Sequence, residues 1–600
     1  MHSAKENHHW ETILSMKKTQ PMSLGLELER HAAQQPSKTA LIYEDLKFTY
    51  DEFNQEANRY ANAFALMGLK KRDVVALMMQ NRPGFLFAVA GLSKLGVIPA
   101  LINTSLRGEA LAQGINQVDA KVLIVGHEIL DVFATVAQRI RLYAPGHVFV
   151  DSPAHDFKIP KEVHTLNTLA NMQTLRPILK GVSVTNPPTT AEITTDDVLV
   201  YMFTSGHKGL RKAVPVLQKR WLQVGHRVAS FGRMHPDSVQ YMALPLQLNS
   251  GFNVCFSGML VTGSTMVLKK QFHVHRFWDD VKTYNCDYLV GVGEMARYLL
   301  SAEPLPEDKD NPLTTMLCAG MLQEVEQPFR ERFGIEHVFE IYGATEGVGV
   351  FVNYDEKPGM CGNLTLHGER QGEVVQYDPE NDTYVLDAKG HAIKCQPGEV
   401  GLLVAYLNEL NPFPGYLKDP EATEAKLLRN VFEAGDLFYN TDDLMMLHED
   451  DYISFVDRLG DTYRWKGRTV SADAVADVVF KFFGPIEDAT VYGMKIPGFE
   501  GRCGMAALVL MADEAMEWDR FAQHLSKRMP EHARPLFVRI LSDVQADVSI
   551  SGLRKQLQQE GFDPNTIKDP IYFLDPRKND IYVPLTEALY QEIVAGKVQF

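Results

Sequence analysis

The chain has 600 residues, an ordinary globular composition and a formal net charge of −16. Its 45% hydrophobic, 10% aromatic and 23% charged residues supply sizeable cores and exclude disorder over most of the length. An acidic balance of this size argues against binding nucleic acid or an anionic membrane through the overall electrostatic field, so we expect no nucleic-acid partner. The overall charge does not argue against local basic pockets that bind phosphate groups.

The cysteines and the N-terminal residues bear on location. No two of the six cysteines are spaced like a zinc pair, so we expect reduced thiols, which are typical of cytosolic proteins. The polar first 18 residues contain no apolar core of a secretory signal. The most apolar stretch, residues 85–102, is interrupted by Lys94, glycine and proline, which favours helix–turn–strand over a membrane span. We expect a cytoplasmic protein and leave peripheral contact with the inner face of a membrane open.

The first 200 residues alternate helix and strand patterns. Thr49, with Glu52 three residues later, forms a capping box before an apolar helical face that ends at Gly68. The expected elements that follow are a strand at 73–79, a helix at 83–96, a strand at 97–102, a helix at 107–118 and a strand at 121–126. This alternation predicts an α/β fold with a parallel sheet covered by helices on both faces.

The pattern changes twice along the chain. Residues 151–195 contain few apolar runs, and we expect them to form a surface excursion. Near Asp457–Asp461 a glycine sits among charged residues, and beyond it we expect short strands with helices near 473–483 and 518–529. The predicted domains are an N-terminal extension of residues 1–39, a large domain of residues 40–458 and a smaller one of residues 459–600.

A buried strand that ends in a glycine-rich basic loop is the first candidate site. Two glycines let backbone amides converge, hydroxyl groups donate at short range and basic side chains supply positive charge, which together suit a polyphosphate. A glycine-rich surface turn is the alternative. The candidate phosphate-binding residues are Thr204, Ser205, Gly206, Lys208, Gly209 and Lys212.

Two further segments carry polar side chains suited to a nucleotide. In the loop after residue 341, Tyr342 is suited to stack on a base, Thr345 to bond a phosphate oxygen and Glu346 to hold Mg²⁺. Asp443 is suited to accept two ribose hydroxyls, with Arg458 reaching ribose or phosphate. Ordinary surface turns are the alternative for each segment alone.

The order of these motifs resembles the AMP-forming adenylate ligases. Within that superfamily the chain looks like the fatty acid transport protein and very-long-chain acyl-CoA synthetase branch, and the match runs from about residue 40 to the C-terminus. The segments that carry the resemblance are residues 100–108, 293–300, 342–347, 457–467, 501–507, 560–564 and 582–586.

The resemblance implies a function and roles for these residues. Such enzymes join a fatty acid to ATP, and CoA thiolate then displaces AMP to give the acyl-CoA; ATP, Mg²⁺ and CoA are therefore the expected cofactors and co-substrates. The large domain would hold the nucleotide, and the smaller α+β domain would be mobile about a hinge at Gly460. Thr345 would contact the α-phosphate and Glu346 would be the metal ligand. Lys466 and Gly467 would approach the path of the CoA pantetheine.

Three motif positions depart from the family pattern. In the phosphate loop, His207 and Lys208 replace two threonines and Arg211 replaces proline. Leu248 stands where the family has a histidine near the acyl pocket, for which Leu248, Gly251, Phe252 and Gly293 are candidate lining residues. Asp442 replaces a glycine and would strain the turn modestly if the position needs a positive φ.

The fourth departure concerns the lysine that bonds the carboxylate and phosphate during adenylation in the family. An ungapped alignment places Ser551 at this position, whereas a gapped alignment restores a catalytic lysine at Lys555. Losing one preorganised donor of this kind costs about 10²–10³ in rate.

The departures leave two hypotheses. The chain is either a long- or very-long-chain fatty acid–CoA ligase with altered motifs or a catalytically impaired relative that binds nucleotide or acyl ligand. A membrane transporter is the third class, and no spanning segment supports it. The sequence predicts neither the acyl chain length nor the oligomeric state.

Overall fold

The computed structural model has two compact units. The larger comprises the described parts of residues 1–205, 212–441 and 446–454, and the smaller takes in residues 442–445 and the described parts of 455–600. The predicted boundaries after residues 39 and 458 stay predictions. The structure describes residues 4–16, 19–143, 146–153, 158–159, 172–204, 212–321, 323–366, 368–378, 383–409, 411–459, 462–466, 468–482, 485–499, 501–511, 514–541, 550–578 and 580–598.

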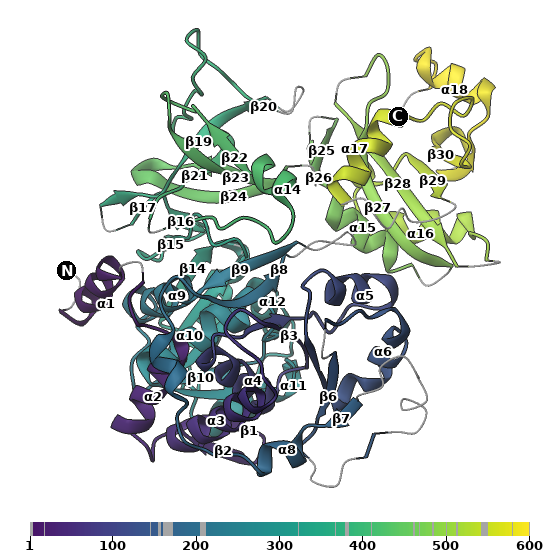
Figure 1. The fold of residues 1–600 in the computed structure, drawn as a ribbon. Coiled ribbons are helices and arrows are strands. Elements are labelled where there is room, and N and C mark those ends of the chain that lie inside the picture. Colours follow the sequence, from purple (N-terminus) through teal and green to yellow (C-terminus); the bar gives the residue numbers. More distant parts are fainter. Residues whose placement is uncertain are drawn as a thin grey trace. The chain divides into compact units, whose positions relative to one another are not determined.

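A seven-stranded sheet in the larger unit contains the predicted alternation. Its order within the described residues is β7-β6-β5-β3-β4-β8-β9, and all pairs are parallel except the antiparallel pair β8–β9. The predicted α/β class is therefore confirmed (Figure 1). The strands are β3 Val74–Met78, β4 Ile98–Leu101, β5 Val122–Gly126, β6 His147–Asp151, β7 Met172–Thr174, β8 Val198–Phe203 and β9 Ala213–Leu217.

The helices of this part begin and end near their sequence signals. Helix α3 (Tyr50–Leu66) has the predicted capping box, with the Thr49 side chain accepting from the Glu52 N–H and the Glu52 carboxylate accepting from the Thr49 N–H. Pro83 begins α4 (Pro83–Lys94), where its missing N–H is not needed. The other helices are α1 Ala4–Ser15, α2 Leu24–Gln34, α5 Gly108–Asn116, α6 Leu130–Ala134 and α8 Arg176–Lys180, with short 3₁₀ turns at His127–Ile129, Ala137–Arg139 and Pro188–Glu192.

A larger sheet holds the remaining strands of this unit, and its strands β23 and β24 also include residues 442–445 and 455–458, which belong to the smaller unit. Among the described residues its order is β2-β1-β11-β10-β12-β13-β14-β15-β16-β24-β23-β21-β19-β20, with β22 paired to β23. The strands are β1 Thr39–Tyr43, β2 Leu46–Thr49, β10 Val239–Met242, β11 Thr265–Leu268, β12 Tyr288–Val292, β13 Thr315–Ala319, β14 His337–Tyr342, β15 Phe351–Asn353, β16 Gly362–Asn363, β19 Gly372–Asp378, β20 Thr383–Tyr384, β21 Val400–Tyr406, β22 Leu427–Arg429, β23 Leu437–Leu447 and β24 Tyr452–Arg458. A separate hairpin pairs β17 Thr365–Leu366 with β18 Glu369–Arg370.

The helices between β9 and β14, together with α14 after β21, complete the larger unit. Helix α9 (Gln218–Phe231) packs on α10 (Ser257–Thr262), which continues from a π-helix at Ser250–Phe256. Trp221 of α9 is fully buried, and its indole N–H donates to the Phe252 carbonyl oxygen at 3.2 Å. The other helices here are α11 Val274–Tyr284, α12 Gly293–Leu300, α13 Gln323–Phe333 and α14 Pro420–Ala425, with a 3₁₀ turn at Glu449–Asp451.

Two expectations about apolar segments had different outcomes. The run at 85–102 forms α4, a turn and β4 as predicted, and no helix among the described residues is long and apolar enough to cross a membrane. The expected surface excursion at 151–195 is wrong for its described second half. There β7 extends the sheet, and Leu175 and Leu179 are fully buried. Two leucines one helical turn apart are too short a pattern to reveal a helix in the sequence.

The buried Lys94 links three helices of the larger unit. Its ammonium group donates to the Asn58 side-chain oxygen at 2.6 Å and lies 3.0 Å from the Glu29 carboxylate. Burial lowers the pKa of Lys94 to about 8, although the Glu29 charge opposes this shift. The cation that interrupts the apolar run in the sequence is therefore a paired core residue.

The smaller unit is built on a five-stranded sheet of order β27-β28-β29-β30-β31. Its strands are β27 Ile486–Met494, β28 Cys503–Leu510, β29 Phe537–Leu541, β30 Ile571–Asp575 and β31 Ile581–Pro584. A hairpin of β25 (Thr462–Trp465) and β26 (Arg468–Ser471) precedes this sheet. The helices are α15 Ala472–Phe480, α16 Trp518–Arg528, α17 Ile550–Glu560 and α18 Glu587–Val594, with 3₁₀ turns at Glu531–Ala533 and Pro576–Lys578. The predicted α+β character of this part is confirmed.

The six cysteines are buried and free, as expected for reduced thiols. Burial is the first cause that raises the pKa of each thiol with a resolved shift, which leaves these groups protonated near neutral pH.

A histidine pair joins α1 to α9. The Nδ1 atoms of His9 and His226 lie 2.9 Å apart, so the two rings share one proton in this contact. Burial, together with the charges of the neighbouring His9 and His8, lowers the pKa of His226 to about 3. The folded state therefore favours neutral His226.

The lowered pKa of His226 predicts a loss of stability in acid. The unfolded chain binds a proton near pH 6.5 that the folded chain resists, so stability falls as the pH drops below 6.5. This histidine contributes about 2 kcal/mol to the loss at pH 5. We expect His226→Gln to reduce the drop in unfolding midpoint between pH 7.5 and pH 5, measured by circular dichroism. The exposed-site control His275→Gln keeps the wild-type drop, and an equal drop in all three proteins contradicts the prediction.

Candidate active site

The two ends of the glycine-rich basic loop are held together at its base. The Thr204 N–H donates to the Lys212 carbonyl oxygen at 3.0 Å, and the Lys212 N–H donates to the Thr204 hydroxyl oxygen at 3.3 Å. These bonds continue the β8–β9 pairing. The candidate residues Ser205, Gly206, Lys208 and Gly209 lie outside the described residues, as do His207 and Arg211.

Lys212 and Glu346 both contact Tyr416, one at its ring and the other at its hydroxyl group. The Tyr416 hydroxyl donates to Glu346 Oε1 at 2.6 Å, and the Lys212 ammonium nitrogen lies 4.7 Å from the centre of the Tyr416 ring. Burial raises the pKa of Tyr416, and the Glu346 charge raises it further, so the hydroxyl stays a donor. The structure thus brings together a cation from the basic loop and the carboxylate of the second motif.

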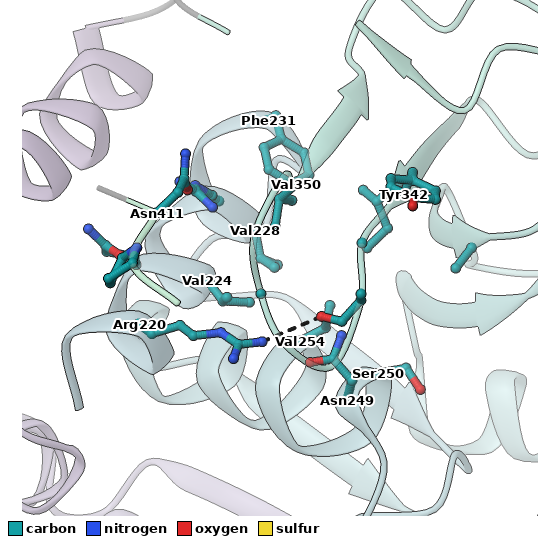
Figure 2. Close-up of a pocket in the computed structure, with 18 residues that line it drawn as sticks. Arg220, Val224, Val228, Phe231, Asn249, Ser250, Val254, Tyr342, Val350 and Asn411 are labelled. Atoms are coloured by element: carbon teal, nitrogen blue, oxygen red, sulfur yellow. Dashed lines mark hydrogen bonds between the residues drawn. The ribbon is translucent and has the colours of Figure 1, made fainter. Parts of the chain in front are cut away.

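Arg220 fixes the loop that carries Thr345 and Glu346. From the first turn of α9 its Nη2 donates to the Thr345 carbonyl oxygen at 2.6 Å. The same nitrogen contacts the Ala344 carbonyl oxygen at 3.5 Å (Figure 2). Gly347 has a φ of 74°, and a Cβ atom there would lie 1.9 Å from Arg220 Nε. Only glycine fits both the left-handed backbone and the close guanidinium.

A buried carboxylate holds the backbone that follows strand β13. Glu340 of β14 accepts hydrogen bonds from the backbone N–H groups of Gly320 and Met321, at 2.5 and 3.1 Å. Burial raises the pKa of Glu340 to about 8, against the lowering effect of these two bonds. This contact fixes the chain after β13 beside the loop that follows β14.

A cavity of about 90 Å³ lies between α9, the π-helix and the loop after β14. Figure 2 shows Val224, Val228 and Phe231 along one face of α9, with Tyr342 on the other side of the cavity. The lining residues are Arg220, Gln223, Val224, Arg227, Val228, Phe231, Asn249, Ser250, Val254, Ala319, Ile341, Tyr342, Gly343, Ala344, Gly347, Val350, Asn411 and Pro412. The walls are mainly apolar, with a few convergent polar groups, as in small-molecule sites.

The four residues proposed from the sequence to line an acyl pocket do not line this cavity. Phe252 is fully buried against Trp221, and a Cβ atom on Gly251 would lie 2.3 Å from the Pro245 carbonyl oxygen, so both serve packing. Gly293 permits a close approach of the Gly320 carbonyl oxygen, and Leu248 is only half-buried. Asn249, Ser250 and Val254 line the cavity instead.

The remaining predicted site residues lie in the smaller unit. Asp443 is a buried residue of β23, and Arg458 ends β24. Lys466 has a φ of 50°, and its ammonium group lies 2.9 Å from the Glu531 carboxylate. Gly467 lies outside the described residues. Asp442, which replaces the family glycine, adopts a positive φ of 61°, so the condition under which modest strain was expected is met.

Lys555 and Ser551 both fall on α17, which runs without interruption from Ile550 to Glu560. Four residues apart, they lie one turn from each other on one face of the helix. The two alignments therefore differ by a single helical turn, and the catalytic assignment of Lys555 stays a prediction.

The sequence analysis missed Arg220, Arg227 and Tyr416. The pair Arg220 and Arg227 had a detectable signal, because two arginines seven residues apart share a helical face with apolar Val224 and Val228. Tyr416 had none, since its partner Glu346 is 70 residues away in the chain.

Comparison with known proteins places this chain in a family. The model of the AMP-binding enzymes matches residues 28–417. The chain is 34% identical to long-chain fatty acid transport protein 6 of Mus musculus, over 95% of this chain and 90% of that protein. It is 32% identical to the medium/long-chain-fatty-acid–CoA ligase FadD6 of Mycobacterium tuberculosis, over 96% and 92%.

Solved structures share the fold. The anthranilate CoA ligase AuaEII in complex with anthranoyl-AMP has a TM-score of 0.65 at 17% identity, over 91% of this chain and 97% of that one. A fatty acyl CoA synthetase of Mycobacterium tuberculosis has a TM-score of 0.58 at 20% identity, over 90% and 98%. The predicted adenylate-forming ligase fold is confirmed. The chain belongs to the AMP-binding enzyme family.

Proposed function

We propose that the protein is a ligase that activates a fatty acid to its acyl-CoA through an acyl-adenylate, with ATP and CoA as co-substrates. The observation that carries the proposal is the grouping of Lys212, Tyr416, Glu346 and Arg220 around the Thr345 loop, beside a mainly apolar cavity. The names of the similar fatty acid transport proteins and of FadD6 support a fatty acid as the acyl donor.

The proposed reaction has two balanced steps. A carboxylate oxygen attacks the α-phosphorus of ATP, an O–P bond forms and pyrophosphate leaves. The CoA thiolate sulfur then attacks the acyl carbon, and AMP leaves with the electron pair of the broken C–O bond. Both leaving groups carry negative charge, so preorganised cations and donors lower both barriers.

The residues of the larger unit have distinct proposed roles. Lys212, with Thr204, Ser205, Gly206, Lys208 and Gly209 of the loop, binds the β- and γ-phosphates. The Thr345 hydroxyl contacts the α-phosphate, and Tyr342 packs on adenine. Arg220 holds the loop of Thr345 in place by donating to the backbone carbonyl oxygen of Thr345.

Glu346 fits the proposed role of a magnesium ligand. Glu346 is 8% exposed, and the Tyr416 hydroxyl donates to its Oε1 at 2.6 Å, which orients the carboxylate. The described residues contain no cluster of three or more metal-ligating side chains, so Glu346 would act with substrate phosphates, as is usual for Mg²⁺. When bound, the ion supplies neutralising charge to the phosphates.

The smaller unit supplies the remaining proposed roles. We propose that Asp443 binds the ribose hydroxyls, that Arg458 assists it, and that Lys466 and Gly467 contact the pantetheine arm of CoA. We also keep the boundary between residues 458 and 459 and the mobility of the C-terminal domain as proposals. Peripheral contact with a membrane stays a prediction of the sequence.

The test of the proposed function is ATP–pyrophosphate exchange with fatty acids from medium to very long chain, followed by detection of the acyl-CoA. We expect acid-dependent exchange and thioester formation. Binding of MgATP by calorimetry without exchange or thioester would instead identify a nucleotide-binding relative. Absence of both binding and turnover, with an active control enzyme, rejects the proposal.

The Tyr416–Glu346 contact predicts that substitutions at either residue change the exchange rate, and that loss of the Tyr416 hydroxyl changes its dependence on Mg²⁺. Glu346→Gln removes the charge and should slow exchange by about 10²–10³. Tyr416→Phe keeps the ring but removes the hydrogen bond that orients the carboxylate, and it should slow exchange by about tenfold, or 1.4 kcal/mol, while raising the Mg²⁺ concentration for half-maximal rate.

A matched control exists for this experiment. Tyr406 also donates to a glutamate, Glu373, at 3.3 Å, but Glu373 is paired with Arg370 and Lys394 and has no proposed role at the magnesium ion. Tyr406→Phe should leave the Mg²⁺ dependence at the wild-type value. The same Mg²⁺ dependence in Tyr416→Phe and wild type contradicts the role of Tyr416.

The two alignments of α17 predict opposite results. If Ser551 occupies the lysine position, Ser551→Lys should raise the adenylation rate by up to about a hundredfold, or 2.7 kcal/mol of barrier. If Lys555 is the catalytic lysine, Lys555→Ala should abolish adenylation, and Ser551→Lys should give no gain. Pyrophosphate exchange measures the first step, and a supplied acyl-adenylate measures the second. Unchanged, brisk exchange in both variants excludes both alignments.

A further inference from the structure

The inner part of the cavity holds buried donors that lack acceptors. Arg220, Gln223 and Arg227 line it from α9, and each is less than one tenth exposed. Their side-chain nitrogens include four buried atoms without a hydrogen-bond partner, namely Arg220 Nε, Arg220 Nη1, Gln223 Nε2 and Arg227 Nε. Native proteins satisfy nearly all such groups, so this concentration at one cavity needs an explanation.

The two arginines differ in what compensates their charge. Burial lowers the pKa of both to about 10, so both stay protonated at neutral pH, and Arg220 has the opposing charge of Glu346 nearby. Arg227 has no carboxylate within ion-pair distance among the described residues. Its Nη2 contacts the Asn411 side-chain oxygen at a long 3.4 Å.

Asn411 is itself held in place as an acceptor. Its Nδ2 donates to Gln371 Oε1 at 2.7 Å, which leaves Oδ1 directed to Arg227. One weak amide contact does not offset the several kcal/mol that burying an unpaired cation costs. A bound anion would accept from Arg227 and Gln223 together and remove this cost.

The two arginines are spaced along the cavity. Its lining residues Arg220, Val224 and Arg227 follow one another along one face of α9. Arg227 lies seven residues beyond Arg220, or about 10 Å along the helix axis. An acid whose reacting carboxylate lies at the Thr345 loop would therefore reach Arg227 only with its far end.

We propose that Arg227, with Gln223, binds a second carboxylate at the far end of the acyl substrate, so that the preferred substrates are dicarboxylic acids. This inference rests on the proposed ligase function, because it assigns the substrate class of the same site. The guanidinium fork suits a carboxylate, and the valines between the arginines contact the methylene chain.

The experiment compares adipic, suberic and sebacic acids with hexanoic, octanoic and decanoic acids in acyl-CoA formation by the full-length protein. We expect at least tenfold higher kcat/KM for the dicarboxylic acid of the favoured length. Arg227→Met should lower this ratio at least tenfold, chiefly by raising KM for the dicarboxylic acid. Arg227→Lys should give a ratio between those of the wild type and Arg227→Met, since lysine keeps the positive charge but lacks the two-pronged guanidinium.

Controls separate the ways in which the idea can fail. Arg276→Met, at an exposed position of α11, should keep the wild-type ratio. If Arg227→Met fails to fold, as judged by circular dichroism, Arg227→Gln takes its place. Failure of every acid to give a thioester rejects the ligase function. Thermal stabilisation of the protein by sebacate and not by decanoate, lost in the Arg227 variant, would still support the carboxylate site.

Two outcomes overturn the inference while the ligase function stands. One is equal or better use of the monocarboxylic acids together with an unchanged ratio in Arg227→Met. The other is a tenfold loss of MgATP affinity in Arg227→Met with the acid preference unchanged, which would assign Arg227 to the nucleotide phosphates.

Discussion

The guanidinium of Arg220 is the contact on which the arrangement of the site depends. It joins the first turn of α9 to the backbone of the loop after β14, and that loop carries both Thr345 and Glu346. Because the partners are carbonyl oxygens, the contact fixes the path of the chain independently of the side chains that the loop presents. The glycine at 347 is required by the same contact, since any Cβ would displace the guanidinium.

A second link continues from this loop to the basic loop. Glu346 bonds the Tyr416 hydroxyl, and the ring of Tyr416 receives the Lys212 ammonium group. The carboxylate and the ammonium group are thus kept near each other without direct pairing, so each remains able to exchange its partner for a phosphate or a cation. An ion pair between them would have to be broken before a nucleotide could bind.

Elements with local signals could be predicted from the sequence, whereas the groups that meet in the site could not. The capping box at Thr49, the proline at 83 and the short apolar strands are local patterns, and the structure contains each of them. The partners of Glu346 and of Arg227 are distant in the chain, and no local pattern indicates them.

That π-helix, Ser250–Phe256, has a consequence for how the cavity could change between related proteins. A π-turn holds one more residue than an α-turn, so deleting one residue there would restore a regular helix. The residues before the deletion, Asn249 and Ser250, would then rotate by about 100° relative to α10 and leave the cavity wall. Length variation in this short segment is therefore a route to a different cavity wall that needs no substitution of any lining residue.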